Sequence, residues 1–278
     1  MNISIKPTFT SISSINESIS NIPPSQLDGI RQRFTASACS LVLATDLDGT
    51  FLHGSHEGRL ALKNLIENNK SSVLLVFVTG RGVETVKEAY LDPLVPKPDI
   101  IISDVGATVV DGQSFQPIAE IQNIVSDQWP GEDVVRKAMS QFPYLSEQTV
   151  PQSNRLSYLV AENEITKDLY DVVEGLGCNS LFSAGMYFDI LPKNASKGTA
   201  LNLLVEHFDL NPDRVLSAGD TLNDYSMLSE KYKSVIVSNA EQELFNRLPI
   251  DASTFHASAP GADGILQAIS HFNLLTIS

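Results

Sequence analysis

Two aspartates separated by a single residue, Asp46 and Asp48, follow the apolar run 41–44 and precede Gly49. A carboxylate can attack phosphorus to form an aspartyl-phosphate intermediate. A neighbouring carboxyl can protonate the leaving alkoxide and then deprotonate the attacking water. Because two carboxylates repel a phosphate dianion, such a site calls for a divalent cation. The segment can also be an Asx turn that ends a strand before a glycine, so the pair alone leaves both interpretations open.

Two further aspartates, Asp220 and Asp224, lie in the segment 219–224 after another apolar run. Their i, i+4 spacing places them on one face if the turn continues into a helix. Mg²⁺ prefers hard oxygen ligands and commonly takes one or two carboxylates together with a phosphate oxygen. A helix N-cap is an alternative role for one of the two aspartates but not for both. The segment therefore predicts a magnesium site.

Two other positions could hold a phosphate group. Thr79 and Gly80 follow the apolar run 73–78, and a hydroxyl with adjacent backbone N–H groups at a strand-to-helix junction can bind phosphate oxygens. A threonine N-cap explains Thr79 equally well. Lys197 lies at the start of a helix that we expect to begin near Gly198, where its charge could neutralise a transferring phosphoryl group. A solvated surface lysine is the alternative.

Short apolar runs, most of them followed by a helical pattern, recur at 41–44, 73–78, 100–102, 214–217 and 234–237. Apolar strands that alternate with helices predict an α/β fold in which a parallel sheet is covered on both faces. In such sheets the polar residues just beyond the carboxyl ends of the strands line the ligand crevice. Asp46, Thr79 and Asp220 hold this position.

The middle of the chain has a different pattern. Helical periodicity near 133–142 and 167–176, with strands near 156–160 and 188–191, predicts a small α+β insertion. We therefore divide the chain into three parts: an N-terminal extension (1–37), a Rossmann-like catalytic core (38–114 and 193–278) and a cap domain for substrate specificity (115–192).

Composition excludes several classes of partner. The 278 residues include 19 Lys and Arg against 33 Asp and Glu, a formal net charge of −14. This acidic balance, without a basic cluster, disfavours nucleic acid and anionic membranes as partners. Cys39 and Cys178 form no CxxC pair, which is typical of a reducing compartment. No apolar run is long enough to cross a bilayer and no secretory signal is evident, so we expect a cytoplasmic protein. The acidic composition and the lack of exposed apolar runs favour a monomer.

In their order along the chain, four motifs resemble those of the haloacid dehalogenase superfamily. They are TDLDGT at 45–50, VTGR at 78–81, SKG at 196–198 and GDTLND at 219–224. The resemblance implies that Asp46 is the nucleophile and Asp48 the general acid/base. It also implies that Thr79 and Lys197 hold the phosphoryl group, with Gly80 and Asn223 at the same substrate site. Mg²⁺ would then be held by Asp46, Asp220, Asp224 and the backbone carbonyl of Asp48.

The cap follows the second motif, which resembles the type IIB subgroup of that superfamily and, within it, the sucrose-phosphate phosphatases. The stretches that carry this resemblance are 97–102, 154–158, 182–185, 189–192 and 268–272. It implies a sugar-phosphate substrate, sucrose 6-phosphate or a related glycoside phosphate, and it places Arg155 and Asp189 near the sugar. A surface arginine and a strand-end aspartate are the alternatives for these two residues.

The chain departs from the sucrose-phosphate pattern at three places. DLDGT stands where DLDNT is expected, GDTLND where GDSGND is expected, and Met186 where a cap lysine would donate to the sugar. Two other functions stay open, a sugar phosphomutase and a non-catalytic domain that binds a sugar phosphate or a glycosyltransferase (synthase) partner. The large cap favours hydrolysis over transfer. The intact set of Asp46, Asp48, Lys197 and Asp220 argues against the binding domain.

Overall fold

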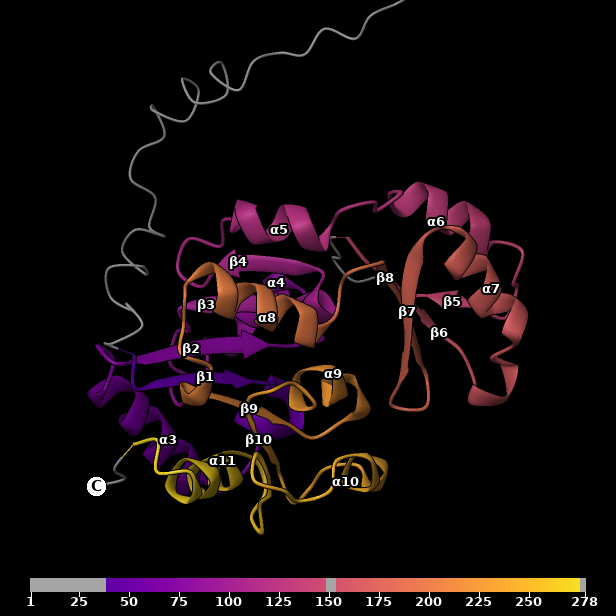
Figure 1. Cartoon of the computed structure of the whole chain (residues 1–278). Helices are drawn as coiled ribbons and strands as arrows, with labels where there is room; N and C mark the ends of the chain where they lie inside the picture. Colours follow the sequence, from indigo (N-terminus) through magenta and orange to yellow (C-terminus); the bar gives the residue numbers. More distant parts are fainter. Residues whose placement is uncertain (1–38, 149–153, 276–278) are drawn as a thin grey trace, which may run out of the picture.

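The computed structural model describes residues 39–148 and 154–275, which form two sheets with helices packed around them (Figure 1). The predicted N-terminal extension, residues 1–37, lies outside the described residues.

The larger sheet has seven strands in the order β11-β10-β9-β1-β2-β3-β4. The strands are β1 Leu41–Thr45, β2 Val73–Val78, β3 Ile100–Ser103, β4 Thr108–Asp111, β9 Val215–Gly219, β10 Lys233–Ile236 and β11 Thr254–His256. Neighbours are parallel except β3 and β4, which pair antiparallel. β1 pairs with β2 on one side and β9 on the other, and all its residues are buried. The residue after β1 therefore leaves the sheet near its centre.

Helices cover both faces of this sheet. On one face lie α3 His56–Asn68, α4 Val83–Ala89 and α11 Gly261–His271, and on the other α5 Ala119–Val125, α8 Lys197–His207, α9 Tyr225–Leu228 and α10 Gln242–Arg247. Alternate residues of β1 feed the two cores, because successive strand side chains point to opposite faces. Leu43 packs in the cluster that contains α3 and α11, and Val42 in the cluster that contains α5 and α8. Burial on both faces explains the continuous apolar runs of the sequence.

The second sheet is antiparallel, with strands in the order β5-β6-β8-β7. The strands are β5 Ser146–Glu147, β6 Leu156–Leu159, β7 Cys178–Ser183 and β8 Tyr187–Pro192, and the helices α6 Glu132–Met139 and α7 Lys167–Gly175 pack with them. Leu156 and Tyr158 belong to the core between sheet and helices, whereas Ser157, which pairs with Asp189, points to the other face. One face of the cap is therefore apolar and covered, and the other is polar.

The predicted fold class is confirmed: a Rossmann-like core of mainly parallel strands carries an inserted, smaller α+β cap. The boundaries of the three predicted segments stay a prediction, and they differ from the packing at one place. α5 falls within the predicted cap, but Ile121 and Val125 pack in a core cluster with Leu201 of α8. An apolar face of this kind buries against the nearest large sheet layer, and for α5 that layer is the core.

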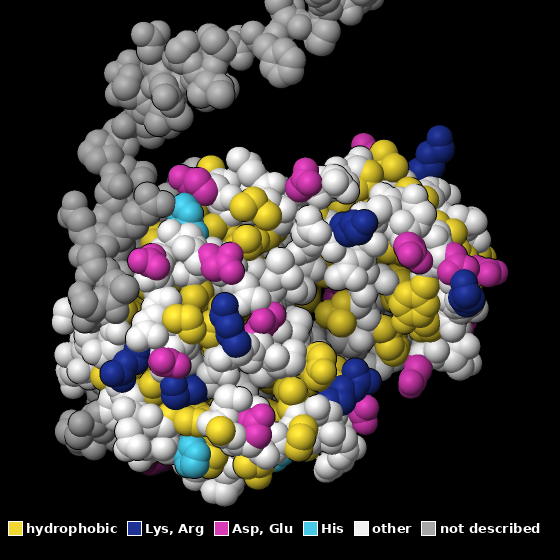
Figure 2. All heavy atoms as spheres, viewed as in Figure 1, with side chains coloured by type: hydrophobic (Ala, Val, Ile, Leu, Met, Phe, Trp, Pro, Cys, Tyr) yellow, Lys and Arg dark blue, Asp and Glu magenta, His cyan; other side chains and the backbone are white. Residues whose placement is uncertain are grey.

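On the face seen in Figure 2, Lys and Arg are interspersed with Asp and Glu over both core and cap. Within the described part of the chain, none of the helices has the length and hydropathy that a membrane span requires. Cys39 and Cys178 are buried free thiols. The predictions of a monomer and of a cytoplasmic location stay predictions.

Candidate active site

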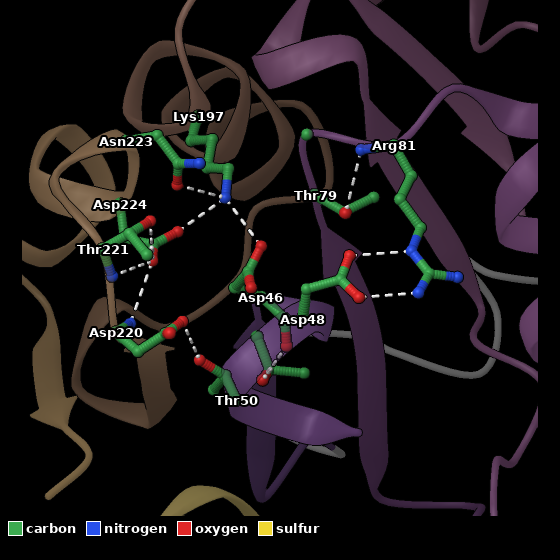
Figure 3. A network of polar contacts seen from close by, with 12 residues as sticks. Asp46, Asp48, Thr50, Thr79, Arg81, Lys197, Asp220, Thr221, Asn223 and Asp224 are labelled. Carbon is green, nitrogen blue, oxygen red and sulfur yellow. Dashed lines mark hydrogen bonds and ion pairs between the residues drawn. The ribbon is translucent and has the colours of Figure 1, made fainter. Parts of the chain in front are cut away.

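The predicted residues meet beyond the carboxyl ends of the central strands (Figure 3). Asp46 follows β1, Thr79 follows β2 and Asp220 follows β9, and these strands are neighbours in the sheet. Lys197 is the first residue of α8 and reaches the same point from the helix. Because parallel strands end at one edge of a sheet, residues distant in sequence converge there. The structure thus brings four of the predicted site residues together.

Lys197 lies at the centre of this group and is fully buried. Its Nζ donates to Asp224 Oδ1 at 2.6 Å, to Asp46 Oδ1 at 2.7 Å and to Asn223 Oδ1 at 2.8 Å. An ammonium group has three donors, so all of them are engaged. Burial lowers the pKa of Lys197, but the carboxylates of Asp224 and Asp46 outweigh it and raise the pKa above its usual value. The lysine therefore stays charged, and a solvated surface lysine is excluded.

Asp224 organises the turn in which it lies. Its Oδ2 accepts the backbone N–H groups of Asp220 and Thr221, each at 3.0 Å. Residues 222–224 form a short 3-10 turn, and α9 begins only after Asp224. Asp220 lies ahead of the helix, so the condition under which Asp220 and Asp224 would share a helix face is not met. The two carboxylates meet because Asp224 folds back onto the amides of its own turn.

Asp220 is held in place by the first motif. Thr50 Oγ1 donates a hydrogen bond to Asp220 Oδ1 at 2.7 Å. Gly49 lies against the same carboxylate with a φ of 77°, and a Cβ here would lie 2.1 Å from Asp220 Oδ2. Only glycine fits this position without moving Asp220.

The buried carboxylates of the site outnumber its ammonium group. The pKa of Asp46 is raised to about 8, chiefly by burial and further by Asp224 and Asp220, against the lowering effect of Lys197. Burial and Asp224 likewise raise the pKa of Asp220 to about 6, although Thr50 opposes the shift. Both shifts reflect negative charge that is poorly solvated and incompletely neutralised. Added positive charge would favour the ionised form of both groups.

These carboxylates suit a divalent cation. Asp46, Asp220 and Asp224 each offer an oxygen, and the three oxygens lie within 4.8 Å of one another. An all-oxygen, carboxylate-rich set is what Mg²⁺ prefers, and its charge would offset the excess negative charge described above. The cluster therefore fits the predicted metal, and the identity of the ligands stays a prediction.

Asp48 points away from Asp46 and towards Arg81 (Figure 3). Arg81 Nε and Nη2 donate to the two carboxylate oxygens of Asp48 at 2.7 Å and 2.6 Å. This is a bidentate, charge-assisted pair, although the Asp48 side chain is 62% exposed. An arginine fork binds an ionised carboxylate, whereas a general acid carries a proton. The predicted acid role of Asp48 therefore requires its side chain to leave Arg81.

A cavity of about 320 Å³ lies between this cluster and the polar face of the cap sheet. Its core side is lined by Asp46, Asp48, Gly80, Arg81, Gly82, Thr85, Val105, Thr221 and Asn223, and its cap side by Gln148, Arg155, Ser157, Ser183, Tyr187 and Asp189. The cap side thus presents amide, guanidinium, hydroxyl and carboxylate groups, which can hydrogen-bond to sugar hydroxyls.

The two cap residues predicted to lie near the sugar both line this cavity and contact each other. Arg155 Nη1 lies 3.5 Å from Asp189 Oδ1, and both side chains are buried. A surface arginine is therefore excluded. Burial raises the pKa of Asp189, and Arg155 opposes the shift. Met186 is 45% exposed on the turn between β7 and β8 and is not among the described residues that line the cavity.

Several site residues were missed by sequence reasoning. Arg81 and Thr50 stand inside two of the motifs, so the signal for them was present: an arginine beside a phosphate-binding turn and a hydroxyl beside an aspartate. The polar cap residues Ser157 and Tyr187 gave a weaker signal. A polar residue between two buried apolar ones in a strand indicates a second, polar face, but not what that face meets.

Comparisons with known proteins agree with this geometry. The family model for sucrose-6F-phosphate phosphohydrolase matches residues 39–273. The chain is 44% identical over 236 residues to a glucosylglycerol-phosphate synthase of Pseudomonas anguilliseptica, which covers 84% of this chain. It is 33% identical over 257 residues to sucrose-phosphatase 1 of Nicotiana tabacum, which covers 86% of this chain.

Among solved structures, the sucrose-phosphatase of Synechocystis sp. PCC6803, in complex with sucrose and phosphate, is similar with a TM-score of 0.75 and 25% identity. That similarity covers 86% of this chain and 100% of the other. The chain spans only 31% of the glucosylglycerol-phosphate synthase and 60% of the tobacco sucrose-phosphatase.

Proposed function

The chain belongs to the sucrose-6F-phosphate phosphohydrolase family, and on this basis we propose that it is a magnesium-dependent phosphatase that hydrolyses a phosphorylated glycoside. The observation that carries the proposal is the place of Asp46. It lines the cap cavity, lies 2.7 Å from the buried ammonium of Lys197, and belongs to a carboxylate cluster that fits Mg²⁺. A nucleophile on the cavity wall thus lies next to a charge-neutralising group and a metal site.

In the first step a carboxylate oxygen of Asp46 attacks phosphorus, and the bond between phosphorus and the ester oxygen breaks. Lys197 neutralises charge on the phosphoryl oxygens. Thr79 Oγ1 accepts the backbone N–H of Arg81 at 3.1 Å, which leaves its hydroxyl hydrogen to donate to a phosphoryl oxygen. Mg²⁺ held by Asp46, Asp220 and Asp224 would supply the positive charge that lets these carboxylates face a phosphate dianion.

Asp48 manages the protons in both steps. It gives its proton to the leaving alkoxide, which departs as the free sugar alcohol, and it then takes a proton from water. The water oxygen attacks phosphorus, the bond to Asp46 breaks, and inorganic phosphate leaves. Because Asp48 is bound by Arg81 in this structure, catalysis requires a change of its side-chain position.

The substrate class follows from the polar cap wall and the names of the relatives. The relative of highest identity among those described above is a glucosylglycerol-phosphate synthase, ahead of the sucrose-phosphatase. This supports glucosylglycerol phosphate as the first candidate and sucrose 6-phosphate as the second. Because the similar segment makes up 31% of that synthase, we also propose a glycosyltransferase that supplies the phosphorylated glycoside as a partner.

The test is phosphate release by the purified protein with and without Mg²⁺. The substrates are glucosylglycerol phosphate, sucrose 6-phosphate, trehalose 6-phosphate, plain hexose phosphates and p-nitrophenyl phosphate, and Asp46→Asn is the control. We expect Mg²⁺-dependent release that is strongest for one glycoside phosphate and lost in the variant. Activity that persists in Asp46→Asn, or a folded protein that binds Mg²⁺ but releases phosphate from none of the substrates, would contradict the proposal.

A further inference from the structure

Arg155 reaches from the cap to the core. Its Nη1 donates to the backbone carbonyl of Gly80 at 2.9 Å and lies 3.5 Å from Asp189 Oδ1, while its Nε lies 3.5 Å from Asp104 Oδ1. Gly80 and Asp104 belong to the core, and Asp189 belongs to the cap. The side chains of the three charged residues are at most 9% exposed. Because water has little access, these attractions are only weakly screened.

Asp104, the core residue that pairs with Arg155, is the first residue of a strained turn. Residues 104–106 follow β3 with φ values of 51°, 58° and 100°. The middle one is Val105, and a β-branched residue at positive φ is a conformation that its surroundings must hold in place. The backbone N–H of Asp104 donates to the carbonyl of Arg81 at 2.9 Å, and that of Val105 to the carbonyl of Thr79 at 3.1 Å. The turn therefore supports the phosphate-binding segment directly.

The same turn also contacts the lysine segment and the cap. A Cβ at Gly106 would lie 2.2 Å from the carbonyl oxygen of Ser196, so the turn lies tightly against the residue before Lys197. Val105 packs in a small apolar cluster with Leu191, at the end of cap strand β8. The turn thus touches three parts of the site: the phosphate-binding segment, the start of α8 and the cap.

We propose that Arg155 is a positioning residue that latches the cap onto the core. By binding Asp189, Asp104 and Gly80 together, it fixes the sugar-facing wall of the cavity relative to the segment 79–81 that holds the phosphoryl group. The latch deepens the proposed function and rests on it for its kinetic assay. A residue that only contacts the sugar would not need Asp104, which is not among the described residues that line the cavity.

Asp104→Asn is the variant that separates the two roles. Asparagine keeps the size of the side chain and tolerates positive φ. Arg155 faces two carboxylates, so removal of one leaves a matched pair with Asp189 and no unpaired cation. We expect kcat for the best glycoside phosphate to fall about tenfold to a hundredfold. KM should change little, because the lost interaction positions the reacting groups and does not bind the sugar.

Arg155→Gln and the double variant Asp104→Asn/Arg155→Gln complete a double-mutant cycle with Asp104→Asn. If both residues act through one link, the double variant is no less active than Arg155→Gln alone. Arg136→Gln is the matched control, because it also removes a cap arginine, but one whose ion pair with Glu147 is exposed. We expect that control to keep wild-type kcat and KM.

Amide hydrogen exchange over residues 79–82 and 104–107 tests the latch without turnover. Asp104→Asn and Arg155→Gln should both exchange faster there than wild type and Arg136→Gln, because a released segment opens more often. The latch is overturned if Asp104→Asn matches wild type in kcat and in exchange, or if the losses of the two single variants multiply in the double variant. If wild type hydrolyses none of the substrates, the proposed function fails, and the exchange comparison alone decides on the latch.

Discussion

Removal of the ammonium at position 197 should be costly for folding as well as for catalysis. Methionine has a similar length and no charge, so Lys197→Met creates no large cavity but leaves Asp46 and Asp224 without their shared cation. Lys197 is fully buried. Breaking a buried ion pair from one side costs about 3–5 kcal/mol, because the remaining charge is not compensated. Domains of ordinary stability unfold with about 5–15 kcal/mol, so the loss is a large fraction of the total.

The assay is urea unfolding in the presence of a chelator, followed by circular dichroism at about pH 9, above the pKa of about 8 to which Asp46 is raised, so that its carboxyl is ionised. The double variant Lys197→Met/Asp46→Asn is the informative comparison, because it removes one of the carboxylates that the single variant leaves unpaired. We expect it to recover about 1–3 kcal/mol relative to Lys197→Met, the usual coupling between contacting charged groups. A loss below about 1 kcal/mol in Lys197→Met, or no recovery in the double variant, would refute the reasoning from buried charge.

Three further predictions concern the same site. Asp48→Asn should lower kcat/KM for glycoside phosphates by about 10²–10⁴ but lower it much less for p-nitrophenyl phosphate, because kcat/KM reports the first phosphoryl transfer and nitrophenolate needs no proton to leave. Equal losses of kcat/KM for the two substrates would exclude the acid role. Gly49→Ala should displace Asp220 and abolish Mg²⁺-dependent activity, and it should lower the free energy of unfolding in urea by about 1–3 kcal/mol. The control Gly175→Ala should keep activity, because a Cβ at that position meets nothing within 4 Å. In the presence of a chelator, the free energy of unfolding should fall as the pH rises from about 4 to about 8. In the folded protein the pKa values of Asp46 and Asp220 are raised to about 8 and about 6, so both groups hold protons that the unfolded chain has already released. A flat profile over that range, or one that Asp46→Asn leaves unchanged, would contradict the assigned cause.

Much of the fold could be predicted because its signals are local. Continuous apolar runs identify strands that are buried on both faces, and the residue after each run lies at the active edge of the sheet. Asp46, Thr79 and Asp220 were found in this way. Membership in the predicted superfamily, with a cap like that of sucrose-phosphatases, is confirmed. The packing of α5 against the core was not visible, because its apolar face is equally compatible with either domain.

The parts that could not be predicted depend on contacts between distant segments. Nothing local in the sequence indicates that Asp48 binds Arg81, because the two residues lie in separate motifs and meet only when the chain folds. Valine favours an extended backbone with negative φ, so its conformational preference does not predict the positive φ of Val105. Arg155 joins segments around Gly80, Asp104 and Asp189, and only the folded chain shows that these meet.

The central claim is that Asp46 becomes phosphorylated, and acid-quench peptide mass spectrometry tests it most directly. The protein is mixed with Mg²⁺ and the best glycoside phosphate, quenched within the first turnover, and digested. We predict a phosphoryl adduct on Asp46 that is absent in Asp46→Asn. With p-nitrophenyl phosphate, whose leaving group needs no acid, the adduct should accumulate further in Asp48→Asn, where the attacking water lacks its base. Phosphate release without any adduct on Asp46, or with an adduct on another residue, would contradict the mechanism.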